Sequence, residues 1–224
     1  MDNPKVNFDP GLQSSDYVLE PDTFVWWSTP ILRRSCPGHE QINEQLKALI
    51  YQKMKSSEGT KKSNEGGWHS EEDLLHWGGP AIAQFQNWII ETFQDLTEAI
   101  SDGRRYEGKL KLNAWANVNK SGDYNASHTH PACVWSGVYY VDAGTTREGQ
   151  RKKAGAIEFM DPRAGSEMMT VPGLAFGKSK TQQARTGDIV VFPSWLRHQV
   201  YPYEGNGERI SIAFNVRIRP ATNK

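Results

Sequence analysis

Two stretches in the first half of the chain repeat apolar residues at the three- to four-residue spacing of a helix. The first runs from His39 to about Met54, and the second from about Pro80 to Ile100. In each stretch the apolar residues share one side, so each predicts an amphipathic helix that packs on a sheet. The apolar stripes consist of Ile42, Leu46, Leu49, Ile50 and Met54 in the first helix and of Ile82, Phe85, Ile89, Phe93, Leu96 and Ile100 in the second.

From residue 108 onward the hydrophobic period changes from helical to two, which predicts strands. In the segment 109–119 one face is apolar, and the other carries Asn113, Trp115, Asn117 and Asn119. An apolar face against helices and an amide-lined face toward a cavity are what a barrel around a polar ligand would show. A strand with one solvated face would show the same pattern, so the sequence leaves the direction of the two faces open.

The remaining pattern predicts an α+β protein in which the N-terminal helices back one face of a β-barrel or sandwich. We expect a single domain over 1–224, with an arm, a strand and supporting helices in 1–107 and a barrel in 108–218. The loops 56–73 and 161–186 are long enough to be functional lids. Besides 109–119, the expected strands are about 24–31, 133–142, 155–160, 187–193, 198–203 and 208–218.

Composition excludes several classes of partner. The 224 residues include 26 acidic and 26 basic side chains, so electrostatics give no reason to expect nucleic acid or a membrane as a partner. No signal-like or membrane-spanning apolar run is present, and Cys36 and Cys133 form no CxxC pair. We therefore expect a cytoplasmic protein with reduced thiols, of open oligomeric state.

Three histidines and one arginine are the candidate functional residues. His128 and His130 are two residues apart on expected extended backbone, so they point to the same side and can bind one metal ion. His198 follows beyond several strands, and imidazole suits Fe, Zn, Cu and Ni. Arg209 lies on the polar face of the next strand, where a buried guanidinium needs an anionic partner such as a carboxylate.

The order and spacing of several segments resemble the 2-oxoglutarate/Fe(II)-dependent oxygenase superfamily. The resemblance covers about 110–218 and is strongest to the prolyl-hydroxylase-like branch, and within that branch to a bacterial and phage group. The segments that carry it are WANVNKSGDYNASHTHP, SGVYYV, GAIEFMDPR, TGDIVVFPSWLRHQVYP and ERISIAFNV, and SNEGGWHS at 63–70 also resembles a hallmark of the bacterial and phage group.

The resemblance implies a double-stranded β-helix, or jelly roll, that uses Fe(II), 2-oxoglutarate and O2 to hydroxylate a substrate. His128 matches the first iron histidine of the family and His198 the distal one. Arg209 matches the residue that binds the far carboxylate of 2-oxoglutarate, and Ser211 lies beside it. By the same resemblance, Tyr140 assists that carboxylate, and Asn117 is a polar residue on the strand before the metal motif.

The chain departs from the family pattern at His130, where the family usually has Asp or Glu. Three readings follow: His130 is the third ligand, the position is left open to water or halide, or a distant carboxylate such as Asp142 or Asp161 replaces it. We favour the first, because the spacing already directs His130 toward the metal. A neutral imidazole leaves the site one charge unit more positive, which a dianionic 2-oxo acid would partly offset.

Other functions remain open from the sequence. A three-histidine dioxygenase without 2-oxoglutarate, a zinc hydrolase and a non-catalytic jelly-roll binding module would each use much of the same pattern. The substrate is expected to be a small molecule or a peptide. Its candidate contacts are Trp68, His69, Trp115 and Trp135, with packing or exposure as an equal alternative for each. For His39, His69 and His76, surface or helix-capping roles are the better expectation.

Overall fold

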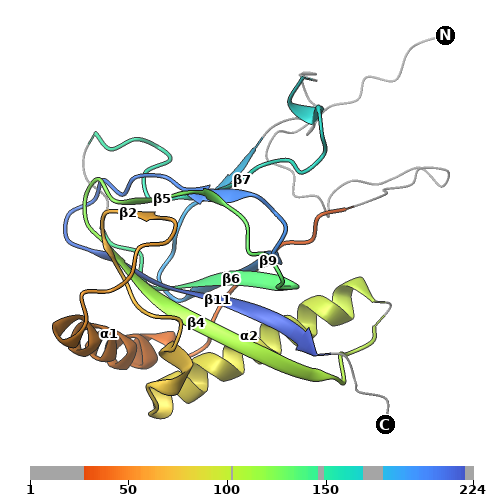
Figure 1. The fold of residues 1–224 in the computed structure, drawn as a ribbon, viewed down its shortest axis with the longest axis horizontal. Coiled ribbons are helices and arrows are strands. Elements are labelled where there is room, and N and C mark those ends of the chain that lie inside the picture. Colours follow the sequence, from red (N-terminus) through yellow and green to blue (C-terminus); the bar gives the residue numbers. More distant parts are fainter. Residues whose placement is uncertain (1–27, 102, 146–148, 169–178, 220–224) are drawn as a thin grey trace.

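The computed structural model describes residues 28–101, 103–145, 149–168 and 179–219, which form two packed β-sheets and two long helices (Figure 1). Short 3₁₀ helices lie at Leu74–His76 and Ser166–Met168. The long helices are α1 (His39–Ser56) and α2 (Pro80–Ile100). The strands are β1 (Leu32–Ser35), β2 (Asn64–Glu65), β3 (Trp68–His69), β4 (Lys109–Asn119), β5 (Tyr124–His128), β6 (Trp135–Asp142), β7 (Ile157–Phe159), β8 (Lys180–Gln182), β9 (Asp188–Pro193), β10 (His198–Val200) and β11 (Arg209–Arg219).

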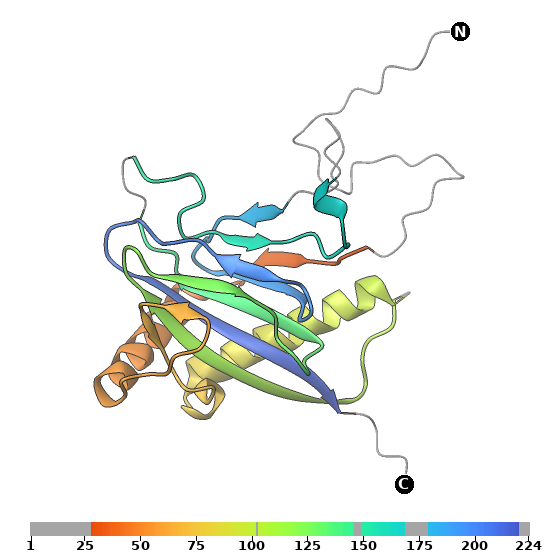
Figure 2. The ribbon, with the colours of Figure 1, turned by 45° about the horizontal axis from the view of Figure 1, so that its top comes forward.

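The two sheets lie face to face, as the expected double-stranded β-helix requires. The larger sheet has the strand order β1-β9-β6-β11-β4-β3, and the smaller one has the order β2-β5-β10-β7-β8. Every pairing between these strands is antiparallel. Figure 2 shows the short strands of the smaller sheet layered over the long strands β4 and β11. The space between the sheets is where a barrel of this kind holds a ligand.

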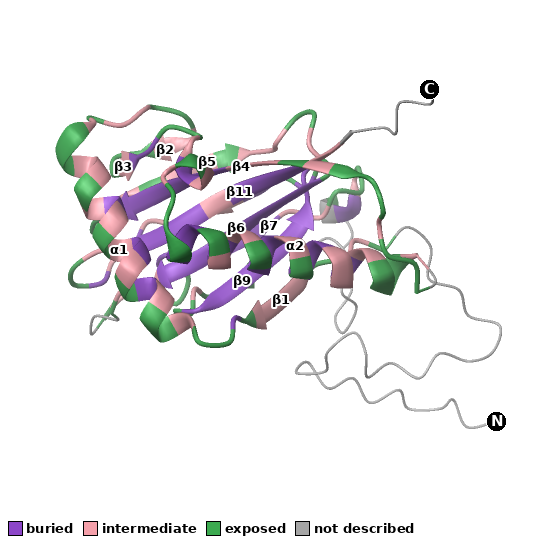
Figure 3. Cartoon of the chain, turned by 90° about the horizontal axis from the view of Figure 1, so that it is seen from below, coloured by how far each residue is buried: buried purple, intermediate pink, exposed green. Residues whose placement is uncertain are grey.

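Both helices pack on the outer face of the larger sheet, and Figure 3 shows them crossing the buried strands. The bounds of α2 agree with the prediction, and α1 continues two residues beyond Met54. Phe85 of α2 meets Tyr139 and Phe214 of the sheet at ring-centroid distances of 5.6 and 6.0 Å. The apolar face of β4 belongs to this core, so the amide-bearing face of the strand points toward the smaller sheet. This settles the direction that the sequence left open.

The first predicted strand is wrong in the half that the structure describes. Residues 24–27 lie outside the described residues, and Ser28–Ile31 form no strand. Strand β1 begins only at Leu32, after Pro30, and pairs with β9 at the edge of the larger sheet. Proline has no N–H to donate to a ladder, which agrees with the start of the strand beyond Pro30.

The long loop 56–73 contains two strands that the sequence did not predict. Strand β2 pairs with β5 of the smaller sheet, and β3 pairs with β4 of the larger sheet. Gly66 and Gly67 join them with φ values of 72° and 64°, in the left-handed region that glycine tolerates. A Cβ atom on Gly67 would lie 2.8 Å from the carbonyl oxygen of Val118. This turn therefore connects the two sheets at one edge of the sandwich.

The second candidate lid and the division of the chain into two parts are not confirmed by the structure. Of the second candidate lid, 161–186, residues 169–178 lie outside the described residues, and residues 180–182 form β8. The division into 1–107 and 108–218 stays a prediction. Among the described residues no helix combines the length and apolar character needed to cross a membrane.

Candidate metal and anion site

His128 and His198 come from neighbouring strands of the smaller sheet. His128 ends β5, His198 begins β10, and the two residues are direct partners in the antiparallel register. Their ring centroids lie 4.4 Å apart. Phe192 of β9 packs edge-on against His198 at 4.6 Å. Sheet pairing thus brings together two histidines that are 70 positions apart in the sequence.

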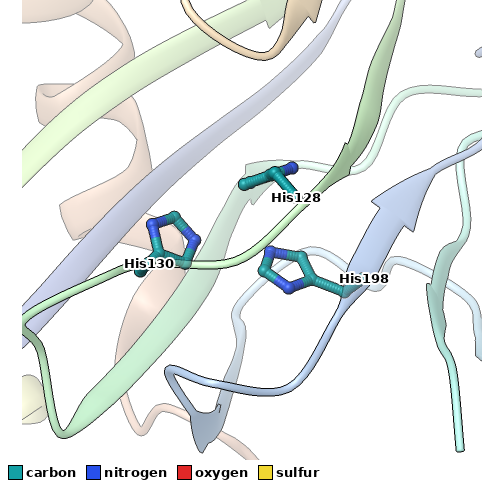
Figure 4. Close-up of side chains that lie close together, drawn as sticks. All are labelled: His128, His130 and His198. Atoms are coloured by element: carbon teal, nitrogen blue, oxygen red, sulfur yellow. The ribbon is translucent and has the colours of Figure 1, made fainter. Parts of the chain in front are cut away.

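His130 completes the cluster from just beyond the end of β5. Its backbone N–H donates to the carbonyl oxygen of Ser194 at 2.9 Å, which fixes the main chain there. Its ring centroid lies 5.0 Å from that of His128 and 5.2 Å from that of His198. One ligand nitrogen from each of the three rings lies within 4.8 Å of the others, and the rings converge in Figure 4.

Carboxylates take no part in this cluster among the described residues. Asp142 forms an ion pair with Lys47 at 2.8 Å, and Asp161 forms one with Arg163 at 2.5 Å. The reading in which Asp142 or Asp161 replaces the family carboxylate is therefore wrong. The geometry leaves His130 as the group nearest to that role.

Backbone carbonyl groups set the tautomer of two of the histidines. Nδ1 of His128 lies 2.7 Å from the oxygen of Ala126, and Nδ1 of His198 lies 2.8 Å from the oxygen of Leu196. A carbonyl oxygen only accepts, so each Nδ1 must donate, and Nε2 is left with its lone pair free for a metal.

Burial keeps the three imidazoles neutral. It lowers the pKa of His128, and together with the neighbouring His128 it lowers the pKa of His130 to about 4 and that of His198 to about 3. The neutral ring is the form that ligates a metal, so at neutral pH the cluster needs no proton release to bind one.

Arg209 begins β11 and lies in the same cavity with only 2% of its surface exposed. Its Nη1 donates to Ser211 Oγ at 3.2 Å and to Asn119 Oδ1 at 3.5 Å, and the guanidinium lies 5.1 Å over the Tyr140 ring. None of the ion pairs among the described residues involves Arg209. A buried cation without an anion is costly, so this part of the cavity is built for a negative ligand.

Two buried donors support the same conclusion. The Nε of Arg209 and the hydroxyl of Tyr140 have no hydrogen-bond partner. Buried polar groups are nearly always satisfied, so two unsatisfied donors in one cavity indicate a missing ligand that accepts hydrogen bonds. Burial also raises the pKa of Tyr140, which keeps its hydroxyl protonated and able to donate.

The residues that the sequence predicted for the metal and the anion lie together. His128, His130, His198, Arg209, Ser211, Tyr140 and Asn117 all line one cavity between the sheets. Asn119, which the sequence placed on the right face but gave no role, contacts Arg209. Only its alternation with Asn117 along β4 could have suggested this contact.

The four candidate substrate contacts do not all reach the cavity. Trp115 lines it, and both Trp115 and His69 line an adjoining groove with His128 and His130. Trp68 and Trp135 pack with the helix-side core instead. The expectation of a surface or capping role for His69 is wrong, because His69 is 3% exposed and belongs to β3.

Comparisons with known proteins agree with this geometry. Residues 113–215 match the family model described as "Putative 2OG-Fe(II) oxygenase". The match begins within β4 and ends within β11, and it contains every residue of the proposed metal and anion sites. No curated protein shows significant sequence similarity to the chain.

Several solved structures share the fold. A prolyl-4-hydroxylase from Pseudomonas putida is 16% identical, with a TM-score of 0.57 over 86% of this chain and 94% of that one. A prolyl hydroxylase from Trichoplax adhaerens, solved with a hypoxia inducible factor peptide fragment, is 11% identical, with a TM-score of 0.58 over 84% and 83%. HygX from Streptomyces hygroscopicus, solved with nickel and 2-oxoglutarate, is 12% identical, with a TM-score of 0.55 over 84% and 83%. These results show that the chain shares the fold of these proteins and that its segment 113–215 is similar to the 2-oxoglutarate/Fe(II)-dependent oxygenase family.

Proposed function

We propose that this oxygenase hydroxylates its substrate with Fe(II) held by His128, His130 and His198 and with the far carboxylate of 2-oxoglutarate bound to Arg209. Ser211, Tyr140 and Asn117 would complete the carboxylate site. The observation that carries the proposal is the buried guanidinium of Arg209, which has no carboxylate partner among the described residues and lies in the same cavity as the three histidines. A metal site alone would not require such a cation.

The residues present fit both groups. Three neutral imidazoles with converging nitrogens suit a first-row divalent metal and leave coordination positions open. The guanidinium fork matches a carboxylate in two parallel hydrogen bonds, and the unsatisfied Tyr140 hydroxyl can add a third donor. His130 in place of a carboxylate leaves the metal end one charge unit more positive, and a dianionic cosubstrate partly offsets this.

Bound Fe(II), 2-oxoglutarate and O2 would together supply the oxidative decarboxylation and the oxidising equivalent for hydroxylation of a C–H bond. The chain's own residues would bind and orient the cosubstrate and exclude water. Arg209 and Ser211 fix one end of the cosubstrate, so that its other end points at the histidines. Phe192, Ile157 and Val138 line the same cavity with apolar side chains, which would help to exclude water.

An anaerobic titration tests the proposal. Purified protein receives Fe(II) and then 2-oxoglutarate, and the visible charge-transfer band of the chelate is recorded. We expect the band in the wild type and in Arg105→Leu, which removes an exposed arginine far from the cavity. Arg209→Leu should still bind iron but need a much higher 2-oxoglutarate concentration. Wild-type protein that binds iron without forming the band would rule out the cosubstrate.

The imidazole of His130 also fits a second class of enzyme. A three-histidine dioxygenase that binds its substrate directly would also place an imidazole at this position. The two functions differ at Arg209, which only the 2-oxoglutarate reaction needs. Turnover that survives Arg209→Leu and releases no succinate would favour the direct dioxygenase. A zinc hydrolase would work without oxygen, and a binding module would show no turnover.

The substrate class and the place of action belong to the same proposal. We propose a peptide or a small molecule as the substrate, and the structural neighbour that was solved with a peptide fragment supports the peptide. We place the enzyme in the cytoplasm, in agreement with the free thiols of Cys36 and Cys133.

A further inference from the structure

The three histidines of the proposed metal site are not held in the same way. His128 and His198 each donate Nδ1–H to a carbonyl two residues earlier in the chain. No such hydrogen bond reaches the ring of His130 among the described residues. Its backbone is fixed by the bond to Ser194, and the following Pro131 favours extended backbone at His130. These restraints do not set the rotation of the ring.

The ring of His130 packs against other aromatic rings instead. The centroid of the Trp115 indole lies 5.9 Å from that of the His130 ring, at an interplanar angle of 45°. The ring of His198 stacks on the His130 ring at a centroid distance of 5.2 Å and an angle of 23°. Trp115 lies on β4, opposite the small Ala213 of β11, so the cavity face has room for the indole. Trp115 is 8% exposed, which leaves it little freedom to change its own orientation.

His69 supports Trp115 in turn. Its ring stacks on the indole at 5.7 Å and 17°. His69 Nδ1 donates to the carbonyl oxygen of Ser70 at 2.6 Å, and Thr60 Oγ1 lies 3.3 Å from the same nitrogen. Strand β3 places His69 opposite Asn117 of β4. The SNEGGWHS segment thus provides the His69 ring, which is held by hydrogen bonds and stacks on the indole of Trp115.

We propose that Trp115 and His69 are positioning residues that orient His130 as the third metal ligand through ring packing. The inference rests on the proposed function, because it takes His130 to be a ligand. It assigns a role to SNEGGWHS, whose two glycines make the tight turn into β3. A carboxylate at position 130 could be oriented by hydrogen bonds to either oxygen, whereas an imidazole without such a bond needs flat neighbours.

Cobalt substitution tests this without any turnover. The full-length apo protein is loaded with Co(II), and the paramagnetically shifted proton signals are used to count the coordinated imidazoles. We expect three in the wild type and two in Trp115→Leu, with Co(II) affinity lower by roughly 10- to 100-fold. Trp115→Phe, which restores a flat ring, should return the count to three. His69→Leu should weaken Co(II) binding less than Trp115→Leu, and His69→Phe should recover most of the loss.

Trp135→Leu is the matched control. Trp135 is 7% exposed and packs in the helix-side core, away from the histidines. It should lower the thermal unfolding midpoint about as much as Trp115→Leu while keeping three imidazoles. Three imidazoles and wild-type affinity in Trp115→Leu would overturn the proposal, and so would a failure of Trp115→Phe to restore the third.

The same spectra separate this inference from the proposed function. If the wild type shows two imidazoles and His130→Ala leaves the spectrum unchanged, His130 is not a ligand, and both the three-histidine site and its positioning residues are refuted. If His130→Ala removes a signal but Trp115→Leu does not, the metal site stands and only the positioning role is refuted.

Discussion

The two sheets differ in support and in what they contribute to the cavity. The larger sheet has 11-residue strands at β4 and β11 and is covered by both long helices. The smaller sheet is built from strands of two to five residues, and neither long helix packs on it. Buried apolar contacts are therefore concentrated on the larger sheet and its helices.

The residues of the site follow the same division. Asn117, Tyr140, Ser211 and Arg209, which we assign to the anion, come from strands of the larger sheet. His128 and His198 come from the smaller sheet. The well-supported sheet thus bears the cost of a buried, unpaired cation, and the lightly supported one carries neutral rings that cost less to bury. Mutations in the two sheets should therefore separate stability, metal binding and cosubstrate binding.

The largest effect should come from the helix-backed face. Phe85→Ala removes a fully buried ring that contacts Tyr139 and Phe214, and it should lower the free energy of unfolding by about 3–5 kcal/mol. Urea unfolding of the apo protein measures the change. At temperatures where the variant is folded, its metal stoichiometry should equal that of the wild type. A lost metal site in folded protein would contradict the division between the sheets.

Removing a metal ligand should lower metal affinity strongly and stability only slightly. His198→Ala takes away a buried imidazole, so we expect Fe(II) affinity to fall by more than about 100-fold, beyond the usual effect of losing an outer partner. The unfolding midpoint of the apo protein should change far less than in Phe85→Ala. Competition with a metal-chelating dye measures the affinity.

His76→Ala serves as the control for that measurement. His76 ends a 3₁₀ helix outside the histidine cluster, so metal affinity should stay unchanged. Equal losses in the two variants would mean that the cluster is not the metal site.

Arg209→Met should separate cosubstrate binding from stability. The loss of hydrogen bonds to a charged group should weaken 2-oxoglutarate binding by roughly 10- to 100-fold. Without cosubstrate, the apolar side chain should leave stability unchanged or raise it, because it removes an unpaired buried charge. Thermal unfolding with and without 2-oxoglutarate tests both points, since the ligand should stabilise only the wild type. A strongly destabilised apo variant would show that Arg209 already has an adequate partner.

The smallest effect concerns the outer side of the smaller sheet. Burial alone raises the pKa of Glu158, but hydrogen bonds from Ser179, Tyr201, Lys153 and Gln199 outweigh it and lower the pKa to about 2 from its ordinary 4.5. A lowered carboxyl pKa adds stability above the unfolded value and loses it as the pH falls from about 4.5 to about 2.

Unfolding midpoints measured between pH 7 and pH 3 test this effect. Glu158→Gln should be less stable than the wild type at pH 7, and the difference should shrink toward pH 3. A difference that does not change with pH would remove the ionised carboxylate as its cause.

The sequence predicted most of the framework because long periodic segments carry their own signal. The stripe from Ile82 to Ile100 predicted α2 and its buried face, and the alternation from Lys109 to Asn119 predicted β4 but left open which face meets the helices. The short strands β2, β3 and β8 have two or three residues, which is too few to show the alternation of apolar and polar residues that predicts a strand. Their pairing depends on tertiary contacts, which local sequence does not reveal.

The site was predicted in outline for similar reasons. The i, i+2 spacing predicted that His128 and His130 share one side, and the alternation around Arg209 placed it on the polar face of its strand. The role of His69 was missed because it depends on β3 folding back over β4, which only the structure shows. The tautomers of His128 and His198 likewise follow from carbonyl positions that no spacing rule supplies.

Strand β11 follows all the other described strands in the sequence, yet it pairs with β4 on one side and β6 on the other, in the middle of the larger sheet. During synthesis on the ribosome, β4 and β6 would emerge first with their pairing edges open, and the sheet would close only when β11 is released. Open strand edges invite association with other chains. The larger sheet should therefore complete its folding only after β11 has been released, and chaperones that shield strand edges should raise the yield of folded protein.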